Sequence, residues 1–251
     1  MRPYIIINGT NSQSIEGLVI STTPSISKPA IRTSVEEIDG RDGDIVTKLG
    51  YSAYDKEIDI GLSFDYNIDE VIKFFNSEGV VTFSNEPDKY YRFEILEQID
   101  FERLIRFKTA TVTFHCQPFK FSVAEHSRVF EISDQLGEID IRNNGNIYSK
   151  PTITITARNN VSLHLDNNQN ITIAMGEEYS TIVIDVENLN AYFYETGNFA
   201  NRVVVGDYND LQLQIGKNTL SYQGEIKEIT IENYSRSVSY THLTLPTILR
   251  V

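Results

Sequence analysis

The sequence has a single cysteine, Cys116, and no tryptophan. One cysteine excludes an intramolecular disulfide framework and a structural zinc site built from several cysteines. No apolar run approaches the roughly 18 residues that a membrane-spanning helix needs. The first residues, Met1 to Tyr4, lead directly into an expected strand without the apolar core of a signal peptide. We therefore expect a water-soluble protein that is made in the cytoplasm.

Positive charge is also scarce. The 251 residues include 22 lysines and arginines against 35 aspartates and glutamates, so the formal net charge is −13 at pH 7. The excess of acid is spread over both halves, and neither half has a basic patch. Because binding to the nucleic-acid backbone depends on clustered lysines and arginines, we expect no DNA binding.

Most of the chain has the pattern of β-strands. Segments rich in β-branched and aromatic residues alternate with Gly, Asn, Asp and Pro. One segment differs, because Asn67 can cap a helix, Ile68 and Val71 follow at helical spacing, and Gly79 can end the helix. We expect one short amphipathic helix over about 68–77, packed on a sheet.

The composition changes after Pro118. Asparagine occurs 5 times in residues 1–125 and 15 times in residues 126–251, where it punctuates short alternating strands. Regularly spaced short strands of this kind are typical of an antiparallel sandwich. The sequence therefore predicts a mainly β protein with two antiparallel β-sandwich domains, over residues 1–122 and 123–236.

The last fifteen residues, 237–251, do not fit this pattern. The decapeptide from Val238 to Thr247 resembles the translated end of a transposase adapter used in sequencing libraries. We interpret residues 237–251 as a non-native tail and exclude them from the fold.

Residues 90–117 predict a long β-hairpin. Alternate residues from Ala110 to Cys116 share an apolar face, whereas Ile105 and Phe107 fall on the threonine-bearing face. Either a β-bulge reverses the register, or the distal ribbon is apolar on both faces. Because a two-stranded ribbon is marginal alone, it either docks on a partner or closes its own sandwich. The candidate subunit contacts are Phe101, Ile105 and Phe107.

Catalytic motifs are absent from the sequence, which has no nucleophile elbow, zinc-protease helix, phosphate loop or dinucleotide fingerprint. The acidic pairs Glu36–Glu37 and Glu177–Glu178 diverge in an extended chain, whereas a glycosidase needs two carboxylates facing each other. His115 and Cys116 diverge for the same reason, which disfavours a metal site. We expect no enzyme activity, no cofactor and no metal.

The segment Asp39–Asp44 superficially resembles a calcium-binding loop. Arg41 stands at a position where such a loop needs an oxygen ligand, so a tight charged turn is the better interpretation.

Several segments of the first half resemble siphophage distal tail proteins, the hub components at the end of long non-contractile tails. They are Ile38–Gly43, Val81–Arg92 with its Ser84-Asn85-Glu86-Pro87 turn and paired tyrosines, and Phe114–Lys120. The resemblance covers residues 1–122. It is looser in the second half, where it depends on Ile182–Val186 and Gly216–Leu220.

This resemblance implies a first β-sandwich with one helix and a long β-hairpin, followed by a galectin-like sandwich. It also implies a hexameric ring that joins the tail tube to the tail-associated fibre or baseplate proteins, beside the tape-measure protein. The protein would then be a virion component at the tail tip, made in the host bacterial cytoplasm. In such a ring, Asp39, Asp42 and Asp44 are candidates to face the lumen.

The alternative function is a carbohydrate-binding adhesion module that uses the second domain on host cell-wall sugar. Galectin-type sugar binding uses a stacking tryptophan, which this chain lacks. Tyr192 and Tyr194 are candidate stacking residues, and packing in the core is the competing interpretation. An acidic glycoside hydrolase is a third and weaker hypothesis.

Overall fold

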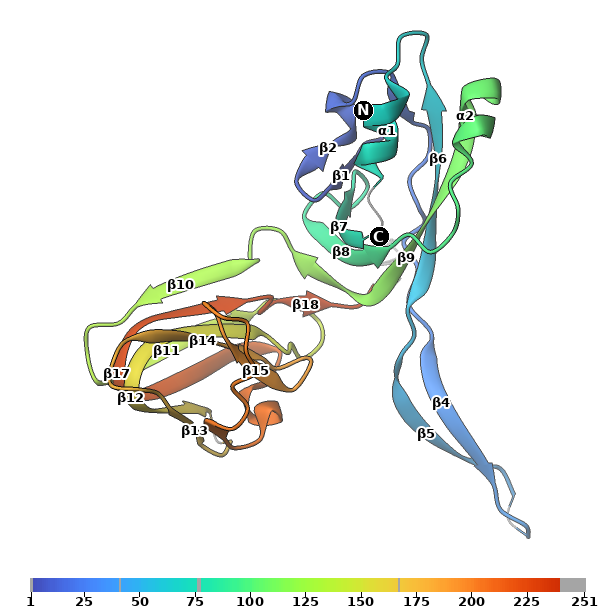
Figure 1. The fold of residues 1–251 in the computed structure, drawn as a ribbon. Helices are drawn as coiled ribbons and strands as arrows, with labels where there is room; N and C mark the ends of the chain where they lie inside the picture. The colour runs from blue at the N-terminus through green and yellow to red at the C-terminus, as the bar shows by residue number, and fades with distance from the viewer. Residues whose placement is uncertain (1, 41, 76–77, 167, 240–251) are drawn as a thin grey trace, which may run out of the picture. The chain divides into compact units, whose positions relative to one another are not determined.

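The computed structural model describes residues 2–40, 42–75, 78–166 and 168–239 (Figure 1). They form two compact units. The first comprises the chain up to Lys120 together with Val238 and Ser239, and the second runs from Phe121 to Ser237. Antiparallel strands dominate both units, which confirms the predicted mainly β class.

The first unit contains one curled sheet, a separate hairpin and two short helices. Its elements are β1 (Ile5–Ile7), β2 (Thr10–Asn11), β3 (Leu18–Ile20), β4 (Ile31–Glu37), β5 (Asp44–Tyr51), β6 (Tyr54–Leu62), α1 (Ile68–Phe74), β7 (Glu78–Phe83), β8 (Lys89–Glu94), α2 (Phe101–Phe107) and β9 (Thr109–Ser122). A 3₁₀ turn over Ser12–Ser14 follows β2. The strand order in the sheet is β2-β1-β7-β8-β9-β6-β3, while β4 and β5 form a separate two-stranded sheet.

The pairing of β6 with β9 forms the centre of the first core. Ile58 lies opposite Val112, and Ile60 lies opposite Ala110, with all four side chains buried. From Ala110 to Cys116, every second side chain of β9 belongs to this core, as the alternation of the sequence predicts. The shared apolar face predicted from Ala110 to Cys116 is therefore confirmed.

Helix α1 is the helix predicted from residue 68. The Asn67 side chain accepts hydrogen bonds from the backbone amides of Asp69 and Glu70, which caps the first turn. Val71 and Phe74 are buried against the sheet. The helix ends at Phe74 rather than at residue 77, and residues 76 and 77 lie outside the described part of the chain.

The predicted β-ribbon over residues 90–117 is wrong in its distal part. Residues 101–107 form helix α2, whose first turn is capped by the Asp100 side chain accepting from the Arg103 amide at 2.8 Å. Leu104 is fully buried, so helical spacing rather than strand alternation directs these apolar side chains. Lys108 then takes a left-handed conformation and directs the chain into β9. The long hairpin of the first unit is instead β4–β5.

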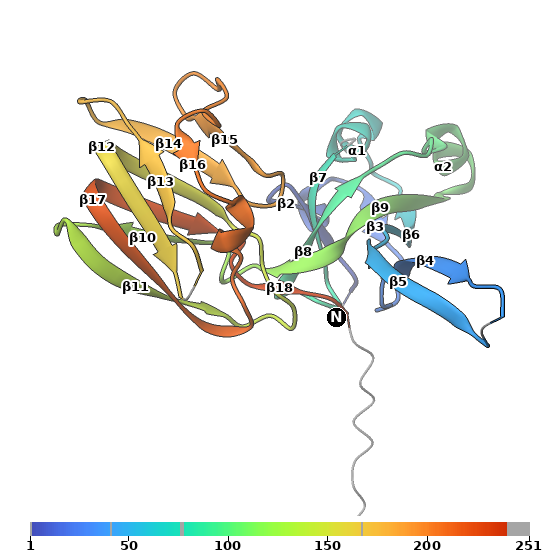
Figure 2. The same ribbon diagram turned by 90° about the horizontal axis from the view of Figure 1, so that it is seen from below.

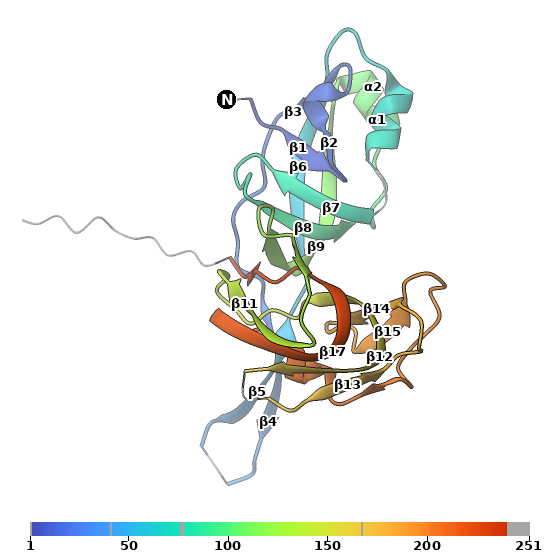
Figure 3. The ribbon, with the colours of Figure 1, turned by 90° about the vertical axis from the view of Figure 1, so that its left-hand side faces the viewer.

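The second unit is a sandwich made from one folded sheet. Its strands are β10 (Ser127–Glu131), β11 (Leu136–Asn143), β12 (Thr152–Leu165), β13 (Ile171–Ala174), β14 (Ser180–Asp185), β15 (Asn190–Phe193), β16 (Val204–Val205) and β17 (Gly216–Glu232). The short strand β18 (Arg236–Ser237) is not part of this sheet and pairs with β9. A 3₁₀ turn covers Tyr208–Leu211. Strands β12 and β17 pair along most of their length, and β17 curves strongly (Figure 3).

Bulges in β12 and β17 divide this sheet into two layers. The register between the two strands shifts twice, from Thr156 to Ala157 and from Arg158 to Ser162. On one side of the bulges β12 and β17 pair with β14 and β10, and on the other side with β13 and β11. Gly224 lies at this bend with φ of +130°, where a side chain would collide with the Asn160 carbonyl.

The predicted non-native tail lies mostly outside the described residues. Within the described part, Val238 and Ser239 are buried in the first unit, so these two positions are packed.

Candidate interaction surfaces

The β4–β5 hairpin extends from the end of the first unit opposite to the two helices (Figures 1 and 3). Val35 lies directly across from Val46, and their side chains are 54% and 58% exposed. Leu49 and Ile38 are also exposed. A two-stranded hairpin is marginally stable on its own in water. Exposed apolar side chains such as these are typical of a contact surface.

The turn of this hairpin carries the acidic residues singled out in the sequence. Asp39 and Asp42 lie in the turn and Asp44 begins β5, and all three side chains are exposed. Glu36 and Glu37 lie opposite Ile45 and Asp44, so consecutive carboxylates point to opposite faces. Glu36 and Glu37 therefore do not face each other. Glu37 does share a face with Asp44 directly opposite, but both side chains are exposed on one hairpin, whereas a glycosidase places its two carboxyl groups on either side of the substrate.

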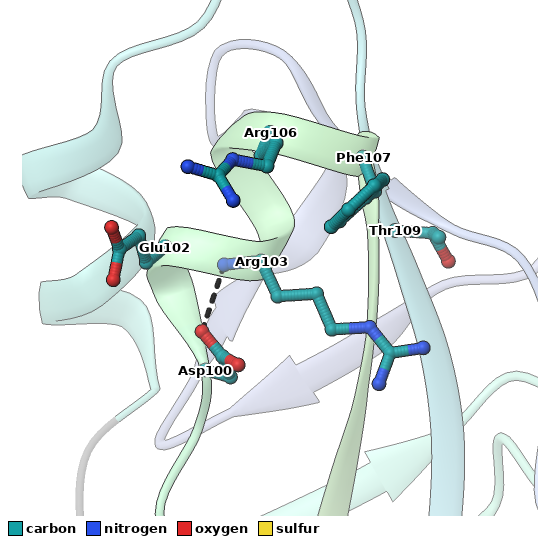
Figure 4. A pocket seen from close by; sticks show the side chains of 6 residues that line it. All are labelled: Asp100, Glu102, Arg103, Arg106, Phe107 and Thr109. Carbon is teal, nitrogen blue, oxygen red and sulfur yellow. Dashed lines mark hydrogen bonds between the residues drawn. The ribbon is translucent and has the colours of Figure 1, made fainter.

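Helix α2 forms one wall of an open depression of about 640 Å³ (Figure 4). The lining residues are Asp100, Glu102, Arg103, Arg106, Phe107 and Thr109. Of the three predicted contact residues, Ile105 and Phe107 are exposed, whereas Phe101 packs partly against the core. The structure therefore brings two of the three to the surface.

Two of the segments that carry the family resemblance, Val81–Arg92 and Phe114–Lys120, meet at a buried polar cluster. The Glu86 carboxylate, in the turn after β7, accepts a hydrogen bond from the Tyr91 hydroxyl and pairs with the Lys120 ammonium. Only about a tenth of the Glu86 and Lys120 side chains is exposed (11% each). The preceding Asn85 donates from Nδ2 to the Pro24 carbonyl at 2.8 Å. These contacts hold the turn after β7 to β8, to β9 and to the segment around Pro24.

Lys56 is a second buried cation beside this cluster. Its ammonium donates to the Ser25 carbonyl at 3.2 Å and lies 4.8 Å from the centre of the Tyr91 ring and 5.1 Å from that of Tyr54. Burial lowers the pKa of Lys56 below its ordinary value, because the charged form loses hydration. The aromatic faces partly replace that hydration.

His115 and Cys116 point to opposite faces of β9, as the strand geometry predicts. His115 Nδ1 lies 2.7 Å from an Asp55 oxygen on the solvent side. Cys116 is fully buried, and burial raises the pKa of its thiol to about 12. Burial likewise raises the pKa of Tyr54 to about 12.

Within the described residues, no group of three or more His, Cys, Asp or Glu side chains could hold a metal ion. No helix in that part of the chain has the length and apolar character to cross a membrane.

Tyr192 and Tyr194 lie on the outer face of the second unit. They belong to β15 and the residue after it, next to β14 (Figure 2). Phe193 between them points inward and packs against the core. Tyr194 is 70% exposed, so packing in the core is wrong for this residue. Phe199, which the sequence reasoning missed, lies across an antiparallel bridge from Tyr192 and is 77% exposed.

A charged cluster lies at the bend of the same unit. Arg158 Nε donates to Glu225 Oε2 at 2.7 Å, and Asn159 Nδ2 donates to Glu225 Oε1 at 2.9 Å. The hydrogen bond from Arg158 lowers the pKa of Glu225. The Arg158 guanidinium also lies 5.0 Å from the Tyr179 ring centre. Arg158 is therefore neutralised by a partner within its own unit.

No protein-family model matches the sequence, and a search of curated proteins finds no match. Solved structures do match the fold. The Dit protein of phage SPP1, described as a paradigm of the hub adsorption apparatus in phages that infect Gram-positive bacteria, is 15% identical with a TM-score of 0.62. The match covers 94% of this chain and 99% of that one.

Two structures of the phage p2 baseplate in its activated conformation match as well. The one with calcium is 9% identical with a TM-score of 0.53, covering 94% of this chain and 98% of that chain. The one with strontium is 9% identical with a TM-score of 0.51, covering 92% and 97%. The resemblance to distal tail proteins is thus confirmed at the level of the fold.

Proposed function

We propose that this protein is a structural component of a long non-contractile phage tail tip. It forms a hexameric ring that joins the tail tube to the fibre or baseplate proteins, and it acts by assembly rather than by catalysis. The observation that carries the proposal is the exposed β4–β5 hairpin on a fold shared with phage hub and baseplate proteins.

The hairpin supports assembly because its apolar side chains need a partner. Val35, Val46 and Leu49 are each more than half exposed. Burying a valine or leucine completely contributes roughly 1.5–3 kcal/mol, and a ring repeats each such contact at every subunit boundary. Ile105 and Phe107 on α2 are further candidates for this contact, and the third predicted contact residue, Phe101, packs partly against the core.

The proposed partners are the tail tube and tape-measure proteins on one side and the tail-associated fibre or baseplate proteins on the other. The protein would be made in the host bacterial cytoplasm and reside in the virion. In the ring, the exposed acids Asp39, Asp42 and Asp44 would face the lumen, where they repel DNA phosphates and let the genome pass.

Light scattering of the purified protein at micromolar concentration tests the ring. We expect a species with six times the chain mass of 28.6 kDa. The double variant Val35→Ser/Val46→Ser should shift this species toward smaller ones while its monomer keeps the wild-type melting temperature, because both side chains are exposed.

A matched control replaces two exposed valines of the second unit, Val129 and Val205, by serine. The control should assemble as the wild type does. A strict monomer for the wild type, or equal disruption by both double variants, would contradict the proposed contact.

A further inference from the structure

The outer face of the second unit carries three aromatic side chains in register. Tyr192 and Tyr194 are two residues apart on one extended segment, so they point to the same side. Phe199 lies directly across from Tyr192 in the antiparallel bridge, and directly opposite residues also share a face. We call Tyr192, Tyr194 and Phe199 the aromatic platform.

The platform stands on a rigid hairpin. The Phe193 amide donates to the Asn198 carbonyl at 3.0 Å, and the Gly197 amide donates back to the Phe193 carbonyl at 2.8 Å. Gly197 has φ of +69°, a conformation that favours glycine in this tight turn. A backbone held in this way loses little conformational freedom when the side chains that it carries bind a ligand.

The hairpin is also held to its neighbours. The Tyr194 amide donates to the Thr181 carbonyl at 2.9 Å, which ties the platform to β14. At the other side, Asn201 Oδ1 accepts from the Ala191 amide at 2.6 Å and from the Tyr208 hydroxyl at 2.8 Å. Hydrogen bonds therefore hold the hairpin that carries the three rings to β14 and to Tyr208.

Polar groups surround the platform within the same hairpin. The turn from Tyr194 to Phe199 contains Glu195, Thr196 and Asn198, all exposed. Their carboxylate, hydroxyl and amide groups are the usual partners of hydroxyl groups. Aromatic faces with such partners beside them suit a sugar ring, whose flat faces carry C–H groups and whose rim carries hydroxyls.

The local charge selects among polysaccharides. Residues 159–201 contain no lysine or arginine, although they include six aspartates and glutamates. The nearest arginine before this stretch, Arg158, is already paired with Glu225. Arg202, which directly follows this stretch, is exposed and is the nearby exception, so residues 159–202 keep a clear excess of negative charge. A phosphate-bearing or sulfated polymer would meet mainly like charge here.

From these observations we infer that the aromatic platform binds a neutral polysaccharide by stacking. This binding site is separate from the proposed ring contacts, which lie on the first unit. It gives the second unit a recognition role in addition to assembly.

An array of neutral and anionic bacterial polysaccharides tests the inference. The wild-type protein should bind one or more neutral polymers in preference to the anionic ones. Tyr194→Leu and Phe199→Leu should each weaken that binding about tenfold or more, which corresponds to about 1.4 kcal/mol. Tyr194→Phe and Phe199→Tyr should retain it, because they keep a flat ring.

The aliphatic and aromatic variants separate a sugar ligand from a protein partner. Leucine keeps much of the apolar area that a protein interface buries, but it lacks the flat face that stacks on a sugar ring. Phe64, fully exposed on the first unit, provides the matched control, and Phe64→Leu should bind as the wild type does. Unchanged melting temperatures would exclude misfolding of the variants.

Three results would overturn the inference: no binding to any neutral polymer, tighter binding to anionic polymers, or full binding by both leucine variants. The mass of the assembled particle is measured on the same samples. Loss of sugar binding with the ring intact would therefore be attributed to the platform, not to the proposed assembly.

Discussion

Val35 and Val46 face each other directly across the β4–β5 hairpin, and more than half of each side chain is exposed to solvent. Within the described part of the chain the two strands pair only with each other, so no third strand there supports them. An apolar pair in this position contributes little to the isolated chain and can contribute to a contact with another subunit. This relationship is the structural reason to regard the protein as a component of an assembly.

Helix α2 should respond very differently to two substitutions. Leu104→Ala removes a fully buried side chain and should lower the free energy of unfolding of the first unit by about 2–5 kcal/mol. Phe107→Ala removes a side chain that is 63% exposed and should change it by about 0.5 kcal/mol or less. Urea denaturation measures both. A larger effect of Phe107→Ala would mean that this ring belongs to the core.

The buried pair of Glu86 and Lys120 should be strongly coupled. Glu86→Gln leaves the buried Lys120 ammonium without its charge partner and should cost about 3–5 kcal/mol of unfolding free energy. The double variant Glu86→Gln/Lys120→Met should cost less than the sum of the single variants, because the stranded charge is gone. Chemical denaturation in a double-mutant cycle measures the coupling. Strict additivity would contradict a direct interaction.

Stability should fall in alkaline solution because of Cys116. Burial raises the pKa of this thiol to about 12, while the unfolded chain ionises near its ordinary value of 9.0. The folded state therefore binds more protons between these values, and its stability is lost as the pH rises through this window. By about pH 10 the thiol should account for about 1 kcal/mol of the loss.

The control for this titration is Cys116→Ala, which lacks the thiol and keeps its surroundings. Urea denaturation at about pH 8 and about pH 10 should show a smaller loss for Cys116→Ala than for the wild type. Equal losses would assign the alkaline instability to other groups, of which Tyr54 is the first candidate.

DNA should not bind to the wild-type protein. Its net charge is −13 and the turn of the hairpin is acidic, so phosphates are repelled and few counterions would be released. Gel shift at about 50 mM salt, where non-specific binding is strong, should show free DNA.

In an assembled particle, Asp39→Lys/Asp42→Lys/Asp44→Lys should slow genome ejection if these residues face the lumen. An unchanged ejection rate would place them elsewhere.

Local signals in the sequence predicted the elements whose side chains obey one clear period. Asn67 and the spacing of Ile68 and Val71 predicted α1, and the alternation in β9 predicted which of its side chains are buried. Both are strongly patterned because one face packs on the core.

Two elements could not be assigned with the same reasoning. Helix α2 has seven residues, and the apolar spacing of Phe101, Leu104 and Ile105 was outweighed by the strand pattern that follows. The β4–β5 hairpin has no buried face, so its sequence shows no alternation of apolar and polar residues that could predict the strands. Glycines at 40 and 43 between two β-branched segments were the available signal for it.

The side-chain clusters depend on tertiary structure. Glu86 and Lys120 are 34 residues apart and meet only because β7, β8 and β9 are neighbours in one sheet. Phe199 lies opposite Tyr192 in an isolated antiparallel β-bridge, and no local sequence pattern predicts this pairing. Sequence reasoning could select Tyr192 and Tyr194 as aromatic candidates, but it could not predict that Phe199 completes their surface.

Cryo-electron microscopy of the tail end of virions that carry this protein tests the central claim most directly. The account predicts six copies of the first unit around the tail axis, between the tube and the fibre or baseplate proteins, with each β4–β5 hairpin against a neighbouring subunit. A tail end that lacks this fold, or one in which Val35 and Val46 remain in solvent, would contradict it.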